Sequence, residues 1–288
     1  MKAPRGIGPI YRFAVRHAAL NILRGRVRRG LYLLVLPLDY WRVHEFPVSL
    51  EYLDPLAGER ILDVSSPKLF AMYVATSIGS HVLTMDIYDD KGLSDVRFSA
   101  GTTGITTLDV LICDVRCLPF PDQSFDKAFS ISVVEHVSPP AGGDGAALKE
   151  IARVLKPGCV AVVTLPFGMR YGEEYRSETI YTRKKKSAAD NVFFQRRHDA
   201  ASLRALLQGL PEFEILREEY VCERWFHRPG RELCTFIAEG NKIKRLSLAP
   251  FYTLFGLIFL KRSPAPIPSS EFMVACLKLR KRGEVSKR

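Results

Sequence analysis

The stretch ERILDVSSPKLFAMYVATSIGSHVLTMD, residues 59–86, decides the fold of this chain. It begins with a short apolar run at Arg60–Val64 that is typical of a buried β-strand. A turn follows, and residues 68–77 then carry apolar side chains at helical spacing until Gly79 ends the pattern. Residues 81–85 form a second β-rich run. This order of strand, helix and strand predicts a doubly wound α/β sheet, whose ligands bind beyond the carboxyl ends of the strands.

Both of these strands end in an aspartate, Asp63 in the first and Asp86 in the second. An acid after the second strand is placed to accept hydrogen bonds from the two hydroxyls of a ribose. The pair therefore indicates a nucleoside-binding half-site. The turn lacks the glycines that usually let a ligand approach the backbone, since Ser65, Ser66 and Pro67 occupy it. We expect Pro67 to be the first helical residue and Ser66 to cap the helix.

The charge of the chain is concentrated at its two ends. Its 288 residues are long enough for one α/β domain with additions, and the formal net charge is +11. Residues 1–50 carry +7 and residues 278–288 carry +5, which leaves −1 for residues 51–277. Basic ends suit an anionic membrane surface or a nucleic acid, and charge alone does not choose between them.

The six cysteines include no Cys-x-x-Cys pair, so we expect free thiols in a reducing compartment and no metal site. No segment reaches the ~20 apolar residues that a membrane-spanning helix needs. The apolar residues 31–38 follow a basic stretch, but they are too few for a secretion signal and no small-residue cleavage site follows. The sequence thus predicts a cytoplasmic protein, and membrane association stays open.

The sequence predicts a basic, helical N-terminal extension or cap at residues 1–57 and a main domain at residues 58–288. Residues 10–35 have the pattern of a basic amphipathic helix, which either lies in a membrane interface or packs across the core with its arginines in water. The main domain contains insertions at about 167–198 and 233–270. The second insertion is strongly apolar between residues 246 and 260, as in an interfacial hairpin or a cap.

Several further segments resemble the class I S-adenosylmethionine-dependent methyltransferases, in particular their small-molecule branch. They are ILDV at 61–64 with Asp86, CDVRCLPFPDQSFD at 113–126, SVVEHV at 132–137 and LKEIARVLKPGCVAVVTLP at 148–166. The resemblance spans residues 58–166. It implies a mostly parallel seven-stranded sheet that ends in an antiparallel hairpin, which the strand patterns at 213–222 and 271–279 would supply.

The resemblance also implies S-adenosyl-L-methionine as the cofactor and gives roles to eight residues. These are Asp63, Ser65 and Ser66 at the methionine end, Asp86 at the ribose, Asp114 and Val115 at the adenine, and Ser130 and Ile131 near the sulfonium. The family usually has Gly-x-Gly-x-Gly in the turn that holds the two serines. Either the turn is reshaped and the serine hydroxyls contact the cofactor, or cofactor binding has been lost. Lys68 either pairs with the cofactor carboxylate or is an ordinary solvent-exposed lysine.

Methyl transfer from a sulfonium requires alignment above all, and a hydroxyl acceptor benefits from a general base. His136 follows the fourth strand and is the first candidate base, with His198 as the second. The alternative for His136 is a helix-start residue with no chemistry. Residues 193–199 combine aromatic and basic side chains, which suits either an anionic or sugar-bearing acceptor or a basic surface connector.

The absence of several known motifs reduces the number of reactions that this chain could catalyse. The chain has no Asn/Asp-Pro-Pro-Tyr/Phe motif, no Pro-Cys pair after the fourth strand and no GxGxxG after the first strand. These absences count against methylation of nucleobases and against a dehydrogenase. We therefore expect a methyltransferase that acts on oxygen of a small-molecule, lipid-linked or glycan acceptor, with an anionic membrane surface as a further partner. A non-catalytic methyltransferase-like binding module is the alternative, and RNA methylation is a second alternative supported by charge alone.

Overall fold

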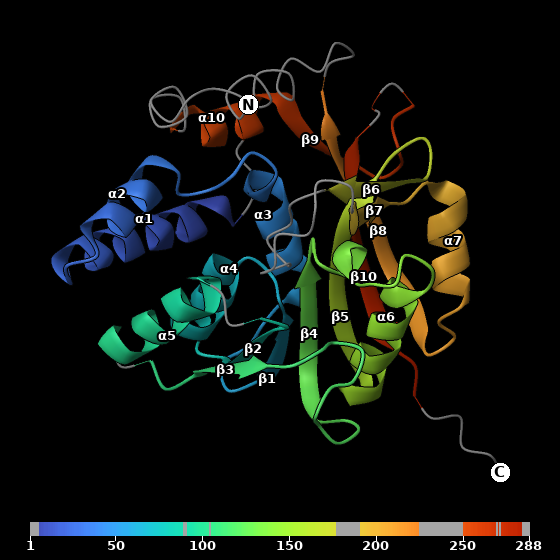
Figure 1. The fold of residues 1–288 in the computed structure, drawn as a ribbon, viewed down its shortest axis with the longest axis horizontal. Coiled ribbons are helices and arrows are strands. Elements are labelled where there is room, and N and C mark those ends of the chain that lie inside the picture. The colour runs from blue at the N-terminus through green and yellow to red at the C-terminus, as the bar shows by residue number, and fades with distance from the viewer. Residues whose placement is uncertain are drawn as a thin grey trace.

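The computed structural model describes residues 6–88, 91–103, 105–176, 191–224, 250–268, 270 and 272–283. Its centre is an eight-stranded sheet in the order β3-β2-β1-β4-β5-β10-β8-β9 (Figure 1). Five strands run parallel: β1 (Arg60–Val64), β2 (His81–Asp86), β3 (Leu108–Ile112), β4 (Phe125–Ile131) and β5 (Leu155–Phe167). Three complete the sheet in antiparallel fashion: β8 (Phe213–Glu223), β9 (Leu260–Ser263) and β10 (Met273–Lys281).

The doubly wound, mostly parallel sheet predicted from the sequence is confirmed, but the expected number of seven strands is wrong. The extra strand is β9, which pairs with the outer end of β8 from Tyr220↔Ser263 to Glu223↔Leu260. It follows directly on the apolar helix α10 (Pro250–Phe259). No sequence pattern predicts β9, because its four residues, LKRS, include only one apolar side chain.

Helices cover both faces of the sheet. One face carries α3 (Arg42–Leu53), α4 (Lys68–Tyr73) with the π-helical turn η1 (Val74–Ile78), and α5 (Lys91–Thr103); the other carries α6 (Gly143–Val154) and α7 (Ala200–Gln208). Each strand contributes side chains to both helical layers because successive side chains point to opposite faces of the sheet. On β4, for example, Ala128 packs with the α6 layer and Phe129 with the α3 layer.

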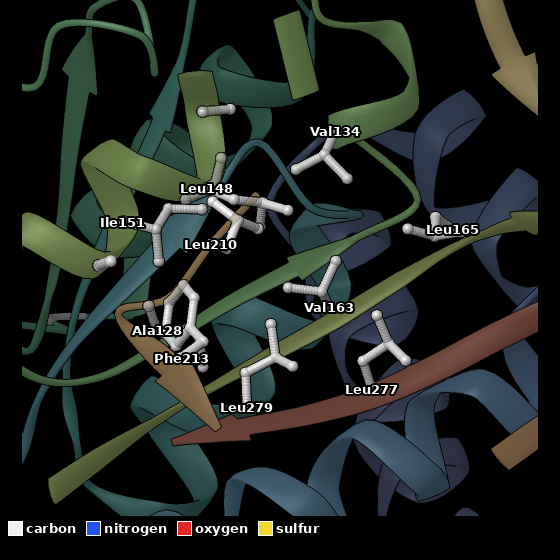
Figure 2. Packing of buried hydrophobic residues seen from close by; sticks show 14 of the residues in the cluster. Ala128, Val134, Leu148, Ile151, Val163, Leu165, Leu210, Phe213, Leu277 and Leu279 are labelled. Atoms are coloured by element: carbon white, nitrogen blue, oxygen red, sulfur yellow. The ribbon is translucent and has the colours of Figure 1, made fainter. Parts of the chain in front are cut away.

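The α6 layer is a closely packed apolar core (Figure 2). Leu148 and Ile151 of α6 face Val163 of β5 and Leu277 and Leu279 of β10, and all are almost fully buried. Burial of each such side chain contributes about 1.5–3 kcal/mol. This core holds β4 and β5 rigidly, and therefore fixes the position of the loop that follows β4.

Residues 10–35, expected as one segment, form a hairpin of α1 (Ile7–Leu23) and α2 (Val27–Val35). The apolar side of α1 is buried, including Ile10 and Ala14, so this helix packs on the protein core. The two helices approach closely at Gly30, where a Cβ atom would lie 2.6 Å from the Ala18 carbonyl oxygen. Helix α1 shares its core with β1 and β2, and the domain boundary expected after residue 57 stays a prediction.

The first insertion contains a separate antiparallel hairpin of β6 (Gly172–Arg176) and β7 (Val192–Arg197). The basic residues 183–186 lie outside the described residues. In the second insertion, α10 packs on the N-terminal region, since Thr253 Oγ1 donates a hydrogen bond to the Leu38 carbonyl at 2.9 Å. Within the described part of the chain, every helix falls short of the length and apolarity required to cross a bilayer.

Candidate active site

A cavity of about 420 Å³ lies where the order of the sheet reverses, between β1 and β4. Its walls are the residues that follow β1, β2, β3 and β4, together with Val192 and Phe193 of β7. In open α/β sheets ligands bind at this switch point, outside the carboxyl ends of the strands. The volume is within the range of about 300–1,000 Å³ that small-molecule sites occupy.

The turn after β1 keeps a glycine-like backbone although it contains no glycine. Ser65 has a φ of 51°, in the left-handed region that favours glycine. Its hydroxyl donates to the Met85 carbonyl at 3.1 Å. The buried Ser66 hydroxyl accepts from the Ile131 amide at 2.9 Å and so ties the turn to the end of β4. Both serines line the cavity, and both hydroxyls already have protein partners.

The expected start of the following helix is wrong in detail. The helix α4 begins at Lys68, Pro67 precedes it, and no side chain caps it. Ser66 does not act as the cap because its hydroxyl bonds across to β4 instead. The sequence pattern for residues 68–77 continues as helix, but its second half has π-helical geometry and ends at Gly79, whose φ is 86°.

Asp63 lies under this turn and is completely buried. Its Oδ1 accepts from the Ser66 amide at 2.9 Å, and its Oδ2 accepts from Thr84 Oγ1 at 2.5 Å. Burial raises the pKa of this carboxyl, and the nearby Lys68 ammonium opposes the shift. Asp63 therefore shapes the floor of the site and does not itself line the cavity.

Lys68 is the residue whose role the sequence left most uncertain, and it lies inside the site. Only 11% of its side chain is exposed, so its interpretation as an ordinary surface lysine is wrong. Nζ donates to Thr84 Oγ1 at 3.2 Å and to the Met85 carbonyl at 3.1 Å. Asp86 Oδ2 lies 3.6 Å from it, beyond hydrogen-bond distance. An ammonium has three N–H donors, so one of them can bind an anionic ligand group in the cavity.

Asp86 and Asp114 line the cavity after β2 and β3, as the sequence predicts for strand-end acids. Asp86 Oδ1 accepts from the Ile87 amide at 2.9 Å. Asp114 is held by the Arg116 guanidinium at 2.6 Å, and this hydrogen bond lowers the pKa of the carboxyl. Val115, expected beside an adenine ring, also lines the cavity. An ionised carboxylate has about four acceptor sites, so both acids retain capacity for a ligand.

Residues at the end of β4 differ from the expected set. Ser130 and Ile131 are fully buried and lie below the cavity wall, whereas Ser132 and Val133 line it. Ser132 has a φ of 52°, and its hydroxyl donates to Glu45 Oε1 at 2.7 Å. Sequence reasoning missed Glu45 because it lies in the aromatic leader before β1, and only the fold brings α3 against β4 and β5.

A buried group of charges lies behind this wall. Arg42 NH1 donates to the Ser132 hydroxyl at 2.9 Å and pairs with Glu45. Glu135 is completely buried in the 3₁₀ turn η2 (Val134–His136), and its Oε2 has no hydrogen-bond partner among the described residues. Burial, with the charge of Glu45 added, raises the pKa of Glu135 to about 8. The Glu135 carboxyl is therefore mostly protonated at neutral pH.

The two candidate bases lie in different surroundings. His136 lines the cavity, and its Nδ1 donates to the Phe194 carbonyl at 2.6 Å. In the neutral ring this places the lone pair on Nε2, and burial lowers the pKa of the imidazole so that the neutral form dominates. His198 is buried away from the cavity, where its Nε2 lies 3.1 Å from Asp144 Oδ2.

Arg196, from the basic segment 193–199, is also a buried structural residue. It donates to the carbonyls of Val137 at 2.6 Å and Pro139 at 2.9 Å, and NH1 lies 3.2 Å from Asp144 Oδ2. These contacts hold the loop that carries His136. Phe193 is the member of the segment that faces the cavity.

Comparison with known proteins identifies a methyltransferase domain in this chain. Residues 62–163 match the family model described as a methyltransferase domain. The chain is 31% identical to a demethylmenaquinone methyltransferase of Clavibacter sepedonicus over 118 residues, 41% of this chain and 44% of that protein. It is 31% identical to the O-methyltransferase rstn1 of Aspergillus nomiae over 110 residues, 38% of this chain and 47% of that protein. The chain thus spans less than half the length of either relative.

Among solved structures, the chain is similar to coclaurine N-methyltransferase bound to N-methylheliamine and SAH. The TM-score is 0.55 and the identity 12%, and the match covers 82% of this chain and 69% of that one. At this identity the likeness shows the fold, which is the Rossmann-like fold expected from the sequence.

The residues around the cavity fit S-adenosylmethionine. The left-handed Ser65 preserves the turn that usually contains glycine, and Asp86 and Asp114 stand at the ends of successive strands. Lys68 supplies a donor for a carboxylate at the β1 side. Residues 62–163 thus match a methyltransferase domain, and the fold around them is the Rossmann-like fold of S-adenosylmethionine-dependent methyltransferases.

Proposed function

We propose that this protein transfers the methyl group of S-adenosylmethionine to oxygen of a small-molecule acceptor. The observation that carries the proposal is the convergence of Lys68, Asp86, Asp114 and His136 on one cavity. The first three suit the cofactor and the fourth suits the acceptor. Support for oxygen comes from the neutral imidazole and from the similarity to an O-methyltransferase.

The chain's own residues would hold the cofactor along the strand ends. Lys68 would bind the carboxylate of the methionine part, Asp86 the ribose hydroxyls, and Asp114 with the Val115 backbone the adenine. When bound, S-adenosylmethionine supplies an electrophilic methyl group, so the protein's main contribution is alignment of the two partners. The buried walls on β4 and α3 exclude water from the end of the cavity near Ser132.

His136 acts as the general base in this proposal. Its Nδ1–H bond to the Phe194 carbonyl fixes the tautomer, which leaves Nε2 to remove the proton of an acceptor hydroxyl. Glu135 Oε1 lies 3.8 Å from Nε2. At neutral pH this carboxyl is mostly protonated, so it stabilises the imidazolium only as the pH rises toward its pKa of about 8.

The acceptor is a small molecule, a lipid-linked compound or a glycan, and we propose that the protein meets it at an anionic membrane surface. The basic ends of the chain support this partner. Phe193 and Val192 give the acceptor side of the cavity an apolar wall, which favours a lipid-linked or aromatic group over a free sugar.

Two alternatives are separated by experiment. A non-catalytic binding module would bind S-adenosylhomocysteine but release no methyl group to any acceptor. An RNA methyltransferase would retain RNA on a filter at low salt and lose it as salt rises. The test of the main proposal is transfer of a radiolabelled methyl group from S-adenosylmethionine to a panel of hydroxyl-bearing phenols, lipid-linked alcohols and glycans, with His136→Gln as the catalytic control. Label that appears only in RNA would contradict the proposal.

A further inference from the structure

The hairpin of α1 and α2 exposes an apolar row that the core does not use. Leu23, with 79% of its surface exposed, is the most exposed large apolar residue in the described part of the chain. Val27, Leu31 and Leu34 follow at a spacing of four and three, which places them on one face of α2. All are exposed, and Gly30 is the buried residue of this helix. A contiguous exposed apolar row of this kind marks an interaction surface.

The inner side of α2 is attached to the protein through arginines. Arg26 and Arg29 lie 2.5 Å and 2.7 Å from the two carboxylate oxygens of Asp95 in α5. The Arg26 guanidinium also lies over the Phe98 ring, 4.5 Å from its centroid. These contacts fix the orientation of the helix, so its apolar row points away from the domain.

The outer side adds positive charge to the apolar row. Arg24 and Arg28 are exposed at the tip of the hairpin, next to Leu23 and Val27. Arg12 and Arg16 are exposed on the neighbouring helix α1. A helix with an apolar face and flanking arginines has the composition of an element that lies in the interface of an anionic bilayer.

The combination favours a membrane over the other occupants. The Val and Leu side chains of the row provide no donors for the phosphates of RNA, whereas lipid acyl chains pack favourably against them. A second copy of this chain on the same face would bring Arg24 and Arg28 against their own images, and like charges at close range oppose association. An anionic lipid surface satisfies both the apolar row and the arginines.

We infer that α2, with the hairpin tip at residues 23–28, is the membrane-docking element of this protein. The inference rests on the membrane contact proposed for the acceptor, and it replaces α1, whose apolar side is buried, with α2. Leu23, Val27, Leu31 and Leu34 enter the acyl region of an anionic leaflet, and Arg24 and Arg28 remain at the level of the lipid phosphates.

The location of this element suits delivery of a lipid-linked acceptor. The exposed Phe251 and Leu254 of α10 extend the apolar surface near the end of α2, since α10 is bonded to Leu38 just beyond that helix. Figure 1 shows α10 at the end of the molecule toward which β4 points. The cavity lies at the carboxyl ends of the same parallel strands.

Co-sedimentation with vesicles tests the inference on the full-length protein. The probes are vesicles of phosphatidylcholine alone and of phosphatidylcholine mixed with phosphatidylglycerol. Wild type should bind the anionic vesicles and lose binding as salt rises. Leu31→Glu should weaken partitioning about tenfold or more, because a charge replaces a leucine that enters the acyl region of the bilayer. Leu56→Glu, at an equally exposed leucine before β1, is the matched control and should remain within about twofold.

The arginines are tested in the same way. Arg24→Glu with Arg28→Glu should reduce binding about tenfold or more, since each cation contributes roughly a factor of five near an anionic surface. Arg170→Glu with Arg204→Glu, two exposed arginines elsewhere, is the matched control. A Tyr32→Trp variant should show a blue-shifted emission with anionic vesicles only.

Calorimetric binding of S-adenosylhomocysteine separates the outcomes. Leu31→Glu should bind it like wild type, which shows that the site is intact. If wild type binds vesicles and Leu31→Glu binds them equally, α2 is not the docking element although the membrane contact stands. If wild type ignores anionic vesicles, the contact and the inference both fail, while cofactor binding still tests the enzyme. A protein that binds RNA but not vesicles would contradict the inference and indicate that the exposed arginines bind nucleic acid.

Discussion

Lys68 Nζ lies 3.6 Å from Asp86 Oδ2, so one ammonium joins the turn after β1 to the end of β2. The same nitrogen lies 3.9 Å from Asp63 Oδ2. The two acids that the sequence singles out thus lie within 3.9 Å of the same cation. A cationic side chain therefore lines the cavity beside a turn that contains no glycine.

Lys68→Met tests whether this ammonium binds the cofactor carboxylate. We expect the affinity for S-adenosylhomocysteine to fall about 10–100-fold, because one hydrogen bond to a charged group is lost. The affinity for 5′-methylthioadenosine, which lacks that carboxylate, should change by less than about threefold. Titration calorimetry with both ligands measures the difference.

Lys127→Met is the matched control for that experiment. Lys127 is another largely buried lysine, paired with Glu59 at 2.8 Å at the opposite end of β4. Its replacement should leave both affinities unchanged. An equal loss of both ligands in Lys68→Met would contradict carboxylate recognition and indicate a purely structural lysine.

His136→Gln should remove the general base without changing the affinity for the cofactor. We expect kcat for a hydroxyl acceptor to fall about 10²–10⁴-fold, whereas binding of S-adenosylhomocysteine stays within about threefold. Because burial lowers the pKa of His136, the imidazole should already be neutral near pH 6.5. Wild-type activity should therefore decline only in more acidic solution. A variant with unchanged kcat would remove His136 from the mechanism.

Glu135→Gln should change how stability depends on pH. The folded-state pKa of Glu135 is raised from 4.5 to about 8, and Glu45, Arg42, Arg196 and His136 are the charged or titratable groups around it. Between these two values the folded protein keeps a proton that the unfolded chain releases, so the free energy of unfolding falls as pH rises. From pH 5 to pH 8 the free energy of unfolding of the variant should therefore rise relative to that of wild type, by on the order of 4 kcal/mol.

Urea unfolding of both proteins at pH 5 and pH 8 measures that difference. Glu150→Gln serves as a control whose difference from wild type should hardly change over this range, since its hydrogen bond with Arg153 lowers the pKa of Glu150 below its ordinary value of 4.5. Stability from that group is present above its ordinary pKa and lost as pH falls. Parallel pH curves for wild type and Glu135→Gln would show that this carboxyl titrates normally.

Arg196→Met should destabilise the fold, because it removes the guanidinium beside the buried Asp144 and three hydrogen bonds to the loop before α6. Breaking such a buried pair costs about 3 kcal/mol, which lowers Tm by roughly 6–10 °C. Arg204→Met, at an exposed arginine on α7, should move Tm by less than about 2 °C. Equal melting temperatures for the two variants would contradict the structural role of Arg196.

The sequence predicts the sheet well because its strands carry short apolar runs and are followed by acids in the same order. Asp86 and Asp114 were found in this way, and both line the cavity. The position of Ser66 was harder to predict. A serine just before Pro67 can cap a helix or form a hydrogen bond to a distant strand, and the local sequence is the same in both cases. Only the pairing of β1 with β4 brings the Ile131 amide within reach of its hydroxyl.

Long-range contacts also explain what the sequence missed. Glu45 and Arg42 come from a helix far upstream, so no local spacing links them to Ser132. Likewise, α1 and α2 have similar composition, and only their packing shows that the apolar side of one is buried while the row on the other is exposed. Burial of this kind is a property of the fold and has no local signature.

The most direct test of the account is calorimetric titration of the purified protein with S-adenosylhomocysteine, compared with Asp86→Ala and with Asp109→Ala. Asp109 is an exposed aspartate in β3, away from the cavity, and serves as the control. We predict micromolar binding to wild type and to Asp109→Ala, and a loss of about 10–100-fold in Asp86→Ala. A folded wild-type protein that binds no S-adenosylhomocysteine would contradict the account and leave the site as a scaffold whose turn no longer serves a cofactor.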